Sequence, residues 1–114
     1  MNLEHQTKGD ATLITVNEPR IDAAIAIQFK DKVREVTQDG PPRVVLDMSQ
    51  VDFLDSSGLG ALVAVMKQLS PDRSFELAGL TGAVEKVFRL TRMDSVFKVH
   101  SSVKDAVAQT CDDT

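Results

Sequence analysis

Short apolar runs that are typical of strands alternate along this chain with segments of helical periodicity. The β-branched run Ala11–Val16 follows the turn residues Gly9 and Asp10, and residues 3–7 lie just before that turn. This arrangement predicts a hairpin of two strands. Further runs predict strands over 43–48, 74–78 and 96–100. Because the apolar residues of 43–48 are mostly consecutive, we expect this strand to be covered on both faces.

Helices are predicted between the later strands. Ile25, Phe29 and Val33 recur at helical spacing after Asp22, a residue type that caps helices. Further helices are predicted from Ser56 to about residue 70, over 82–92, and after a capping Ser101, with Val103, Ala106 and Val107 on the last one. Strands that alternate with helices pair in parallel through right-handed crossovers. We therefore expect one α/β domain over residues 1–114, with a mostly parallel central sheet of about five strands, an antiparallel N-terminal edge hairpin and about four helices.

Charge and the distribution of apolar residues narrow the possible partners. The chain has 114 residues and a net charge of −4, which disfavours nucleic acids and anionic membranes as partners, because both select basic surfaces. The longest apolar run, 59–66, is much shorter than the about 18 residues that a membrane span needs, and the N-terminus lacks the pattern of a signal peptide. The single cysteine, Cys111, cannot form an internal disulfide. We expect a cytoplasmic protein.

The motifs of several enzyme classes do not occur in the sequence. It contains no HExxH metalloprotease motif, no GxSxG nucleophile elbow and no P-loop. Gly58 and Gly60 match the start of a dinucleotide-binding fingerprint, but Val63 occupies the position of its last glycine. These observations argue against hydrolase, nucleotide-binding and metalloprotease activity.

Two sets of ionisable residues could carry chemistry. Asp47, Asp52 and Asp55 lie around the end of one predicted strand, and carboxylates are ligands for Mg²⁺, but no phosphate-binding loop accompanies them. We interpret His5 and His100 as ordinary surface or hydrogen-bonded residues. We therefore expect no catalytic residue, no metal and no cofactor.

The segment D-S-S-G-L-G at 55–60 is the best candidate for a functional site. It follows a buried strand and opens a helix, and the carboxyl ends of parallel strands are where binding sites gather. A helix N-terminus offers unpaired N–H groups and a partial positive charge, so it would accommodate a phosphate attached to Ser56. The alternative interpretation is that Asp55 and Ser56 only cap the helix.

A helical wheel of this segment suggests a second surface. One face holds the apolar residues expected in the core: Leu59, Leu62, Val63, Met66 and Leu69. The opposite face holds Ala61, Ala64, Val65 and Gln68, of which three are apolar. Such a face is either covered by the protein itself or available to a partner, and we expect a docking surface. Ile27, off the core face of the first helix, would extend it.

The run VVLDMSQVDFLDSSGLGALVAVMKQL resembles the STAS domain, specifically that of bacterial anti-sigma-factor antagonists. The resemblance covers nearly the whole chain. It includes Ile21-Asp22 before the first helix, the strand RVVLDM, the segment Val84–Met93 and the residues Val96–Val99.

The resemblance implies a partner switch. In this family the first serine of D-S-S-G, here Ser56, is phosphorylated by a GHKL-type serine kinase, which often doubles as an anti-sigma factor. A PPM-type phosphatase removes the phosphate, and the unmodified antagonist binds the kinase. We expect the partner-binding surface around Ser56 to comprise Asp22, Asp55, Ser57, Gly58, Ala61, Ala64 and Val65.

Two departures leave the choice of partner open. The family often has Gly-x-Leu-Asp before the first helix, whereas this chain has Pro19-Arg20-Ile21-Asp22, and Val65 stands at a position that is often polar. The target could therefore lie in secretion, biofilm formation or motility. A different alternative is a STAS subunit held permanently in a transporter complex, which would not need a phosphorylated serine. A hydrolase that uses Ser56 lacks a placed base.

Overall fold

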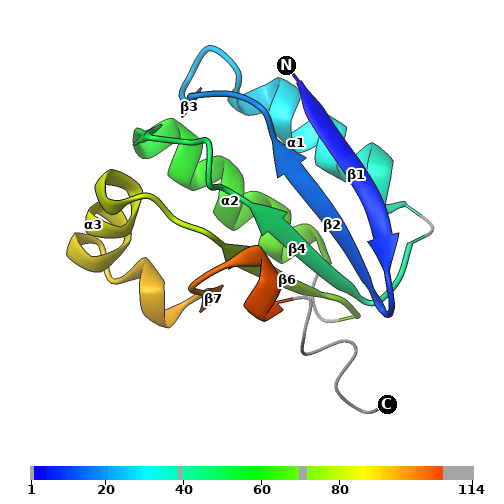
Figure 1. Cartoon of the computed structure of the whole chain (residues 1–114). Coiled ribbons are helices and arrows are strands. Elements are labelled where there is room, and N and C mark those ends of the chain that lie inside the picture. Colours follow the sequence, from blue (N-terminus) through cyan, green and yellow to red (C-terminus); the bar gives the residue numbers. More distant parts are fainter. Residues whose placement is uncertain (1, 39, 70–71, 107–114) are drawn as a thin grey trace.

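The computed structural model describes residues 2–38, 40–69 and 72–106 (Figure 1). Its strands are β1 (Leu3–Lys8), β2 (Ala11–Val16), β3 (Arg20–Ile21), β4 (Arg43–Asp47), β5 (Phe53–Leu54), β6 (Ser74–Ala78) and β7 (Lys98–His100). Its helices are α1 (Ala26–Thr37), α2 (Ser56–Leu69), α3 (Gly82–Leu90) and the short 3₁₀ helix η1 (Met93–Ser95). A last helix is described over 103–106. Val107 and Cys111 lie outside the described residues.

The central sheet has five strands in the order β1-β2-β4-β6-β7. β1 and β2 are antiparallel, and their register runs from Leu3 opposite Val16 to Lys8 opposite Ala11. The other neighbours in this sheet are parallel. The turn between β1 and β2 places Gly9 at φ 61°, a conformation that glycine adopts without strain. The predicted mostly parallel sheet with an antiparallel edge hairpin is confirmed.

Two layers of side chains cover the sheet. The main core lies between the sheet and the helices and contains Phe29 of α1, Leu62 of α2 and Phe88 of α3. A smaller cluster lies on the other face, where Val45 and Ala78 meet Ala106 of the last helix. Figure 1 shows α1 and α2 side by side behind the sheet, with the last helix in front of it. Val44 and Leu46 point into the main core while Val45 points away, so the consecutive apolar run of β4 reflects cover on both faces, as predicted.

Some predicted boundaries are wrong for local reasons. Asp22 does not cap α1, because its Oδ1 accepts a hydrogen bond from the Ala24 N–H (3.0 Å) in a turn that precedes the helix. The last helix is capped by Ser102 and not by Ser101, since Ser102 Oγ accepts from the Asp105 N–H at 3.1 Å. The last strand begins at Lys98, because the N–H of Val96 bonds to the Met93 carbonyl oxygen in η1.

The helical wheel assigned the wrong residues of α2 to the surface. Ala61 is 3% exposed and Val65 1%, and both belong to the main core together with Leu62. Leu59 and Val63, which were expected in the core, are only partly buried against it. The reason is that α2 contacts α1 as well as β6, so it is covered from two directions. Ala61 and Val65 therefore cannot belong to a docking surface.

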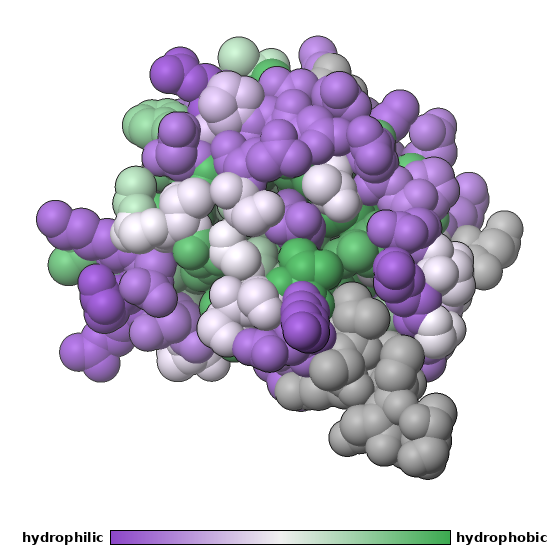
Figure 2. All heavy atoms as spheres, viewed as in Figure 1, coloured by the Kyte–Doolittle hydropathy of each residue, from purple (hydrophilic) through white to green (hydrophobic). Residues whose placement is uncertain are grey.

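The surface carries few apolar side chains. Figure 2 shows one face of the molecule, on which hydrophilic residues dominate the periphery and apolar atoms appear in small areas near the centre. The large apolar residues that are exposed in the described part of the chain are Ile27, Phe53, Leu90, Val96 and Val99. No helix among the described residues is both long enough and apolar enough to cross a membrane.

Candidate functional site

Ser56 is the first residue of α2, and its side chain is exposed, as is that of Ser57. The predicted start of this helix is confirmed. The Ser56 hydroxyl makes no hydrogen bond to any residue that the structure describes. It is therefore accessible at the end of the helix where backbone N–H groups are unpaired.

Asp55 caps this helix. Its Oδ1 accepts a hydrogen bond from the Gly58 N–H at 2.8 Å, and its carbonyl oxygen accepts from the Leu59 N–H at 2.9 Å. The sequence offered both Asp55 and Ser56 as capping residues, and in the structure the Asp55 carboxylate caps the helix. The serine hydroxyl is consequently not needed to hold the helix end.

The loop after β3 is fastened to the same helix end. Asp55 Oδ2 accepts a hydrogen bond from the Ala23 N–H at 3.4 Å, so one carboxylate joins the loop to the first turn of α2. Gly58 contributes by its small size, because a Cβ at this position would lie 2.1 Å from the Ile21 carbonyl oxygen and 2.8 Å from Leu54 Cδ1. Gly58 is buried for this reason, and its predicted place in the partner-binding surface is wrong.

A small parallel sheet lies beside Ser56. In it β3 pairs with β5, with Arg20 opposite Phe53 and Ile21 opposite Leu54. Ile21 and Leu54 are buried, while Arg20 and Phe53 are exposed. The Arg20 guanidinium carbon lies 5.3 Å from the centre of the Phe53 ring, and its Nη1 lies 3.7 Å from Asp22 Oδ2. Sequence analysis missed Arg20 and Phe53, because strands of two residues leave no periodic signal.

The predicted surface residues thus fall into two groups. Asp22, Asp55 and Ala64 are partly exposed and Ser57 is exposed, so these four can still face a partner. Gly58, Ala61 and Val65 are buried. Ile27 is 68% exposed on α1, as expected of a residue off the core face.

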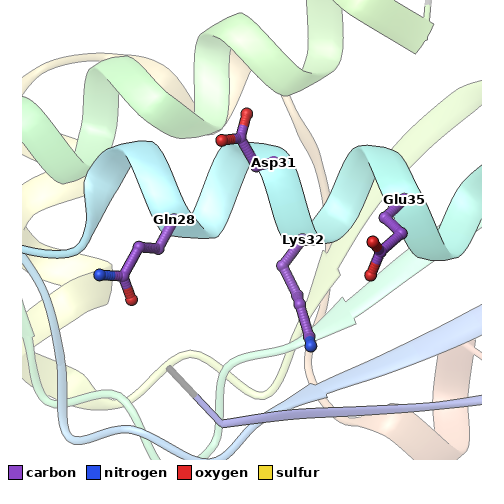
Figure 3. A pocket seen from close by; sticks show the side chains of 4 residues that line it. All are labelled: Gln28, Asp31, Lys32 and Glu35. Atoms are coloured by element: carbon purple, nitrogen blue, oxygen red, sulfur yellow. The ribbon is translucent and has the colours of Figure 1, made fainter.

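Two further candidate sites, a metal site and a hollow on α1, lack what a ligand needs in the described part of the chain. Within the described ranges, no three His, Cys, Asp or Glu side chains form a group that could hold a metal ion. A hollow of about 350 Å³ is lined by Gln28, Asp31, Lys32 and Glu35. All four side chains project from α1, and in Figure 3 Asp31 points to the opposite side from Lys32 and Glu35. A single charged helix surface of this kind does not enclose a small molecule.

A buried ionic cluster occupies a different part of the fold. Glu76 of β6 accepts two hydrogen bonds from Arg43 of β4 (2.9 and 2.6 Å) and one from Ser74 Oγ (2.9 Å), and its Oε1 lies 2.7 Å from His100 Nε2. Burial raises the pKa of Glu76, but the hydrogen bonds from Arg43, His100 and Ser74 and the charge of Arg43 outweigh it and lower the pKa to about 2. Arg43 also donates to the carbonyl oxygen of Ala106 at 3.3 Å. The cluster therefore connects four elements: β4, β6, β7 and the last helix.

The described residues form a mostly parallel α/β domain. At the N-terminus of α2 it displays Ser56, whose hydroxyl makes no hydrogen bond to a described residue. The chain belongs to the STAS domain family, whose model matches residues 2–106.

Several proteins that are similar to this chain are named anti-sigma-factor antagonists. It is 29% identical over 87 residues to anti-sigma-F factor antagonist RsfB of Mycobacterium tuberculosis, which is 76% of this chain and 71% of the relative. It is 31% identical over 102 residues to the "Putative anti-sigma factor antagonist BtrV" of Bordetella bronchiseptica, covering 89% of this chain and 88% of that one. The crystal structure of an anti-sigma factor antagonist from Mycobacterium paratuberculosis superposes with a TM-score of 0.84 at 26% identity and covers 96% of this chain and 92% of its own.

Proposed function

We propose that this protein is an anti-sigma-factor antagonist that switches partners through reversible phosphorylation of Ser56. One observation carries the proposal: the Ser56 hydroxyl is exposed and unbonded among the described residues, while the neighbouring Asp55 already caps α2. A kinase can therefore modify Ser56 without removing a contact that holds the helix. The similarity to proteins named anti-sigma-factor antagonists supports the same interpretation.

In this proposal the phosphate acts on binding and not on folding. A phosphoserine adds about −1.5 to −2 charges, and a helix N-terminus tolerates an anion. Inside a docked surface the same charge lies beside the Asp55 carboxylate, and like charges in an interface cost several kcal/mol. A loss of about 2.8 kcal/mol already lowers the affinity about a hundredfold.

The partners follow from the family resemblance. The unmodified protein binds a GHKL-type serine kinase that serves as an anti-sigma factor, and a PPM-type phosphatase restores Ser56. The docking surface centres on Ser56 and includes Ser57, Asp22, Asp55 and Ala64. The protein itself is regulatory and not an enzyme, acts in the cytoplasm, and uses neither nucleic acid nor membrane as its partner.

The two adjacent serines provide a matched test of phosphorylation. Each GHKL-type kinase of the source organism is incubated with ATP and the wild-type chain, Ser56→Ala or Ser57→Ala, and intact masses are measured. One added phosphate is expected on the wild type and on Ser57→Ala but not on Ser56→Ala. Modification that persists in Ser56→Ala would contradict the proposed site.

Binding variants test the switch itself. Ser56→Asp is expected to unfold at the same temperature as the wild type but to bind the kinase at least tenfold more weakly, whereas Ser56→Ala binds without regulation. If Ser56→Asp keeps full affinity in a stable complex, the chain is a permanent subunit of an assembly and not a switch. If Ser56→Asp melts far below the wild type, the charge acts on the fold.

A further inference from the structure

The exposed face of the small β3–β5 sheet carries two side chains that contact each other and that the proposed switch does not use. Arg20 lies over the ring of Phe53, with 5.3 Å between the guanidinium carbon and the ring centre. The Arg20 side chain is 62% exposed, and Phe53 is 44% exposed. Both residues therefore face solvent although they contact each other.

This pair lies close to the phosphorylation site along the chain and through contacts. Phe53 is three residues before Ser56, and β3 continues into the Ala23 loop that Asp55 fastens to α2. The close approach of Gly58 to the Ile21 carbonyl oxygen fixes β3 against the same helix. Both β3 and β5 contact α2, so the small sheet is held in a fixed position against the helix that Ser56 begins.

Two acidic side chains of this surface, Asp55 and Asp22, are engaged within the chain. Both carboxylate oxygens of Asp55 accept backbone hydrogen bonds, and Asp22 Oδ1 accepts one from Ala24. The Arg20 side chain forms one ion pair with a described carboxylate, that of Asp22 at 3.7 Å, and makes no hydrogen bond to a described residue. Because a guanidinium carries five N–H donors in a planar fork, most of its donors remain available for an external acceptor.

We propose that the Arg20–Phe53 pair determines partner specificity by binding a carboxylate and an adjacent apolar side chain on the protein that docks over Ser56. The proposal rests on the partner-switch function. Arginine is among the residue types that dominate binding energy at interfaces, and phenylalanine is enriched in interfaces. Stacking on Phe53 and the contact with Asp22 hold Arg20 before the partner arrives, which reduces the side-chain entropy lost on binding.

The probe is the purified kinase that modifies Ser56 in the mass assay, without ATP. Its affinity is measured by calorimetry for the wild type, Arg20→Gln, Arg20→Lys and Phe53→Ala, with Arg34→Gln on the exposed surface of α1 as the control. Arg20→Gln is expected to weaken binding at least tenfold, and Arg20→Lys to weaken it as well, because an ammonium cannot form the bidentate pair. Phe53→Ala is expected to weaken binding, while Arg34→Gln stays within twofold of the wild type.

The outcomes separate this inference from the proposed function. If Ser56 is phosphorylated and Arg20→Gln binds within twofold of the wild type, the proposed role of the Arg20–Phe53 pair is refuted, while the proposed phosphorylation switch is not. Equal weakening by Arg20→Gln and Arg34→Gln would also refute it, since the effect would then be general electrostatic attraction. If no kinase modifies Ser56, the proposed function is refuted, and the proposed role of the Arg20–Phe53 pair is refuted with it. Unfolding temperatures within about 2 °C of the wild type exclude misfolding of the exposed Arg20 variants.

Discussion

Replacing Glu76 with glutamine removes the negative charge at the centre of the buried ionic cluster. The side chain of Glu76 is 4% exposed and that of its partner Arg43 is 16% exposed. The variant therefore leaves a largely buried guanidinium without its counter-charge, since Asp10 is more distant from it, at 3.7 Å, and 56% exposed. Removing one partner of a buried pair costs about 3–5 kcal/mol, because the remaining charge is uncompensated.

The pKa of Glu76 gives a second, independent magnitude. It falls from its ordinary value of 4.5 to about 2 in the folded protein. A pKa difference of about 2.5 corresponds to about 3 kcal/mol in favour of the folded state. Because the folded pKa is the lower one, this contribution is complete above pH 4.5 and is lost as the pH falls from 4.5 towards 2. The two approaches agree on a cost of about 3 kcal/mol for Glu76→Gln at neutral pH.

Urea unfolding of the wild type and Glu76→Gln between pH 7 and pH 2 measures this contribution. The difference in free energy of unfolding should be about 3 kcal/mol at neutral pH and should narrow below pH 4.5. Glu85→Gln is the control, since Glu85 is exposed and its ion pair with Arg89 spans 3.9 Å on the surface of α3, so its cost should stay below about 0.5 kcal/mol. A Glu76→Gln cost under about 1 kcal/mol, or a difference that does not change with pH, would refute the reasoning.

Two further substitutions test the packing of α2. Gly58→Ala should destabilise the fold by about 1–3 kcal/mol or more in thermal unfolding, because its Cβ would meet the Ile21 carbonyl oxygen. The control Gly60→Ala, whose Cβ meets nothing within 4 Å, should stabilise the fold by about 0.5–1 kcal/mol. Equal stabilities of the two variants would contradict this packing. Ala61→Arg should abolish the cooperative unfolding transition, because it buries a charge in the main core, while the exposed control Gln68→Arg should unfold like the wild type. A well-folded Ala61→Arg protein would show that Ala61 lies on the surface after all.

The sequence predicted the central sheet well because each strand carries its own signal. The run of 43–48 is apolar on consecutive positions, and its structure explains why: Val44 and Leu46 enter the main core while Val45 enters the cluster under the last helix. The turn residues between β1 and β2 predicted the hairpin from an equally short stretch of sequence, and Gly9 of this turn has a positive φ in the structure. These elements depend on properties that a short window of sequence contains.

The face of α2 could not be predicted as reliably, because it depends on two neighbours at once. The helix is apolar almost all round, so a wheel fits more than one orientation. The sheet and α1 together bury Ala61, Leu62 and Val65, which rotates the buried side of the helix relative to the face predicted from Leu59. Only the tertiary arrangement decides which small residues lie between two helices and which face solvent.

The Ser56 side chain takes no part in the contacts that stabilise the start of α2. Asp55 and Gly58 fix the start of α2 through a cap and a close backbone approach, and neither contact involves the Ser56 side chain. The ionic cluster around Glu76 joins β4, β6, β7 and the last helix through contacts that do not include α2. A phosphate on Ser56 therefore breaks no contact with a described residue. Its charge can weaken binding to a partner without destabilising the fold. A serine that also served as the helix cap could not provide this, because each phosphorylation would remove about 1 kcal/mol of capping energy from the fold itself.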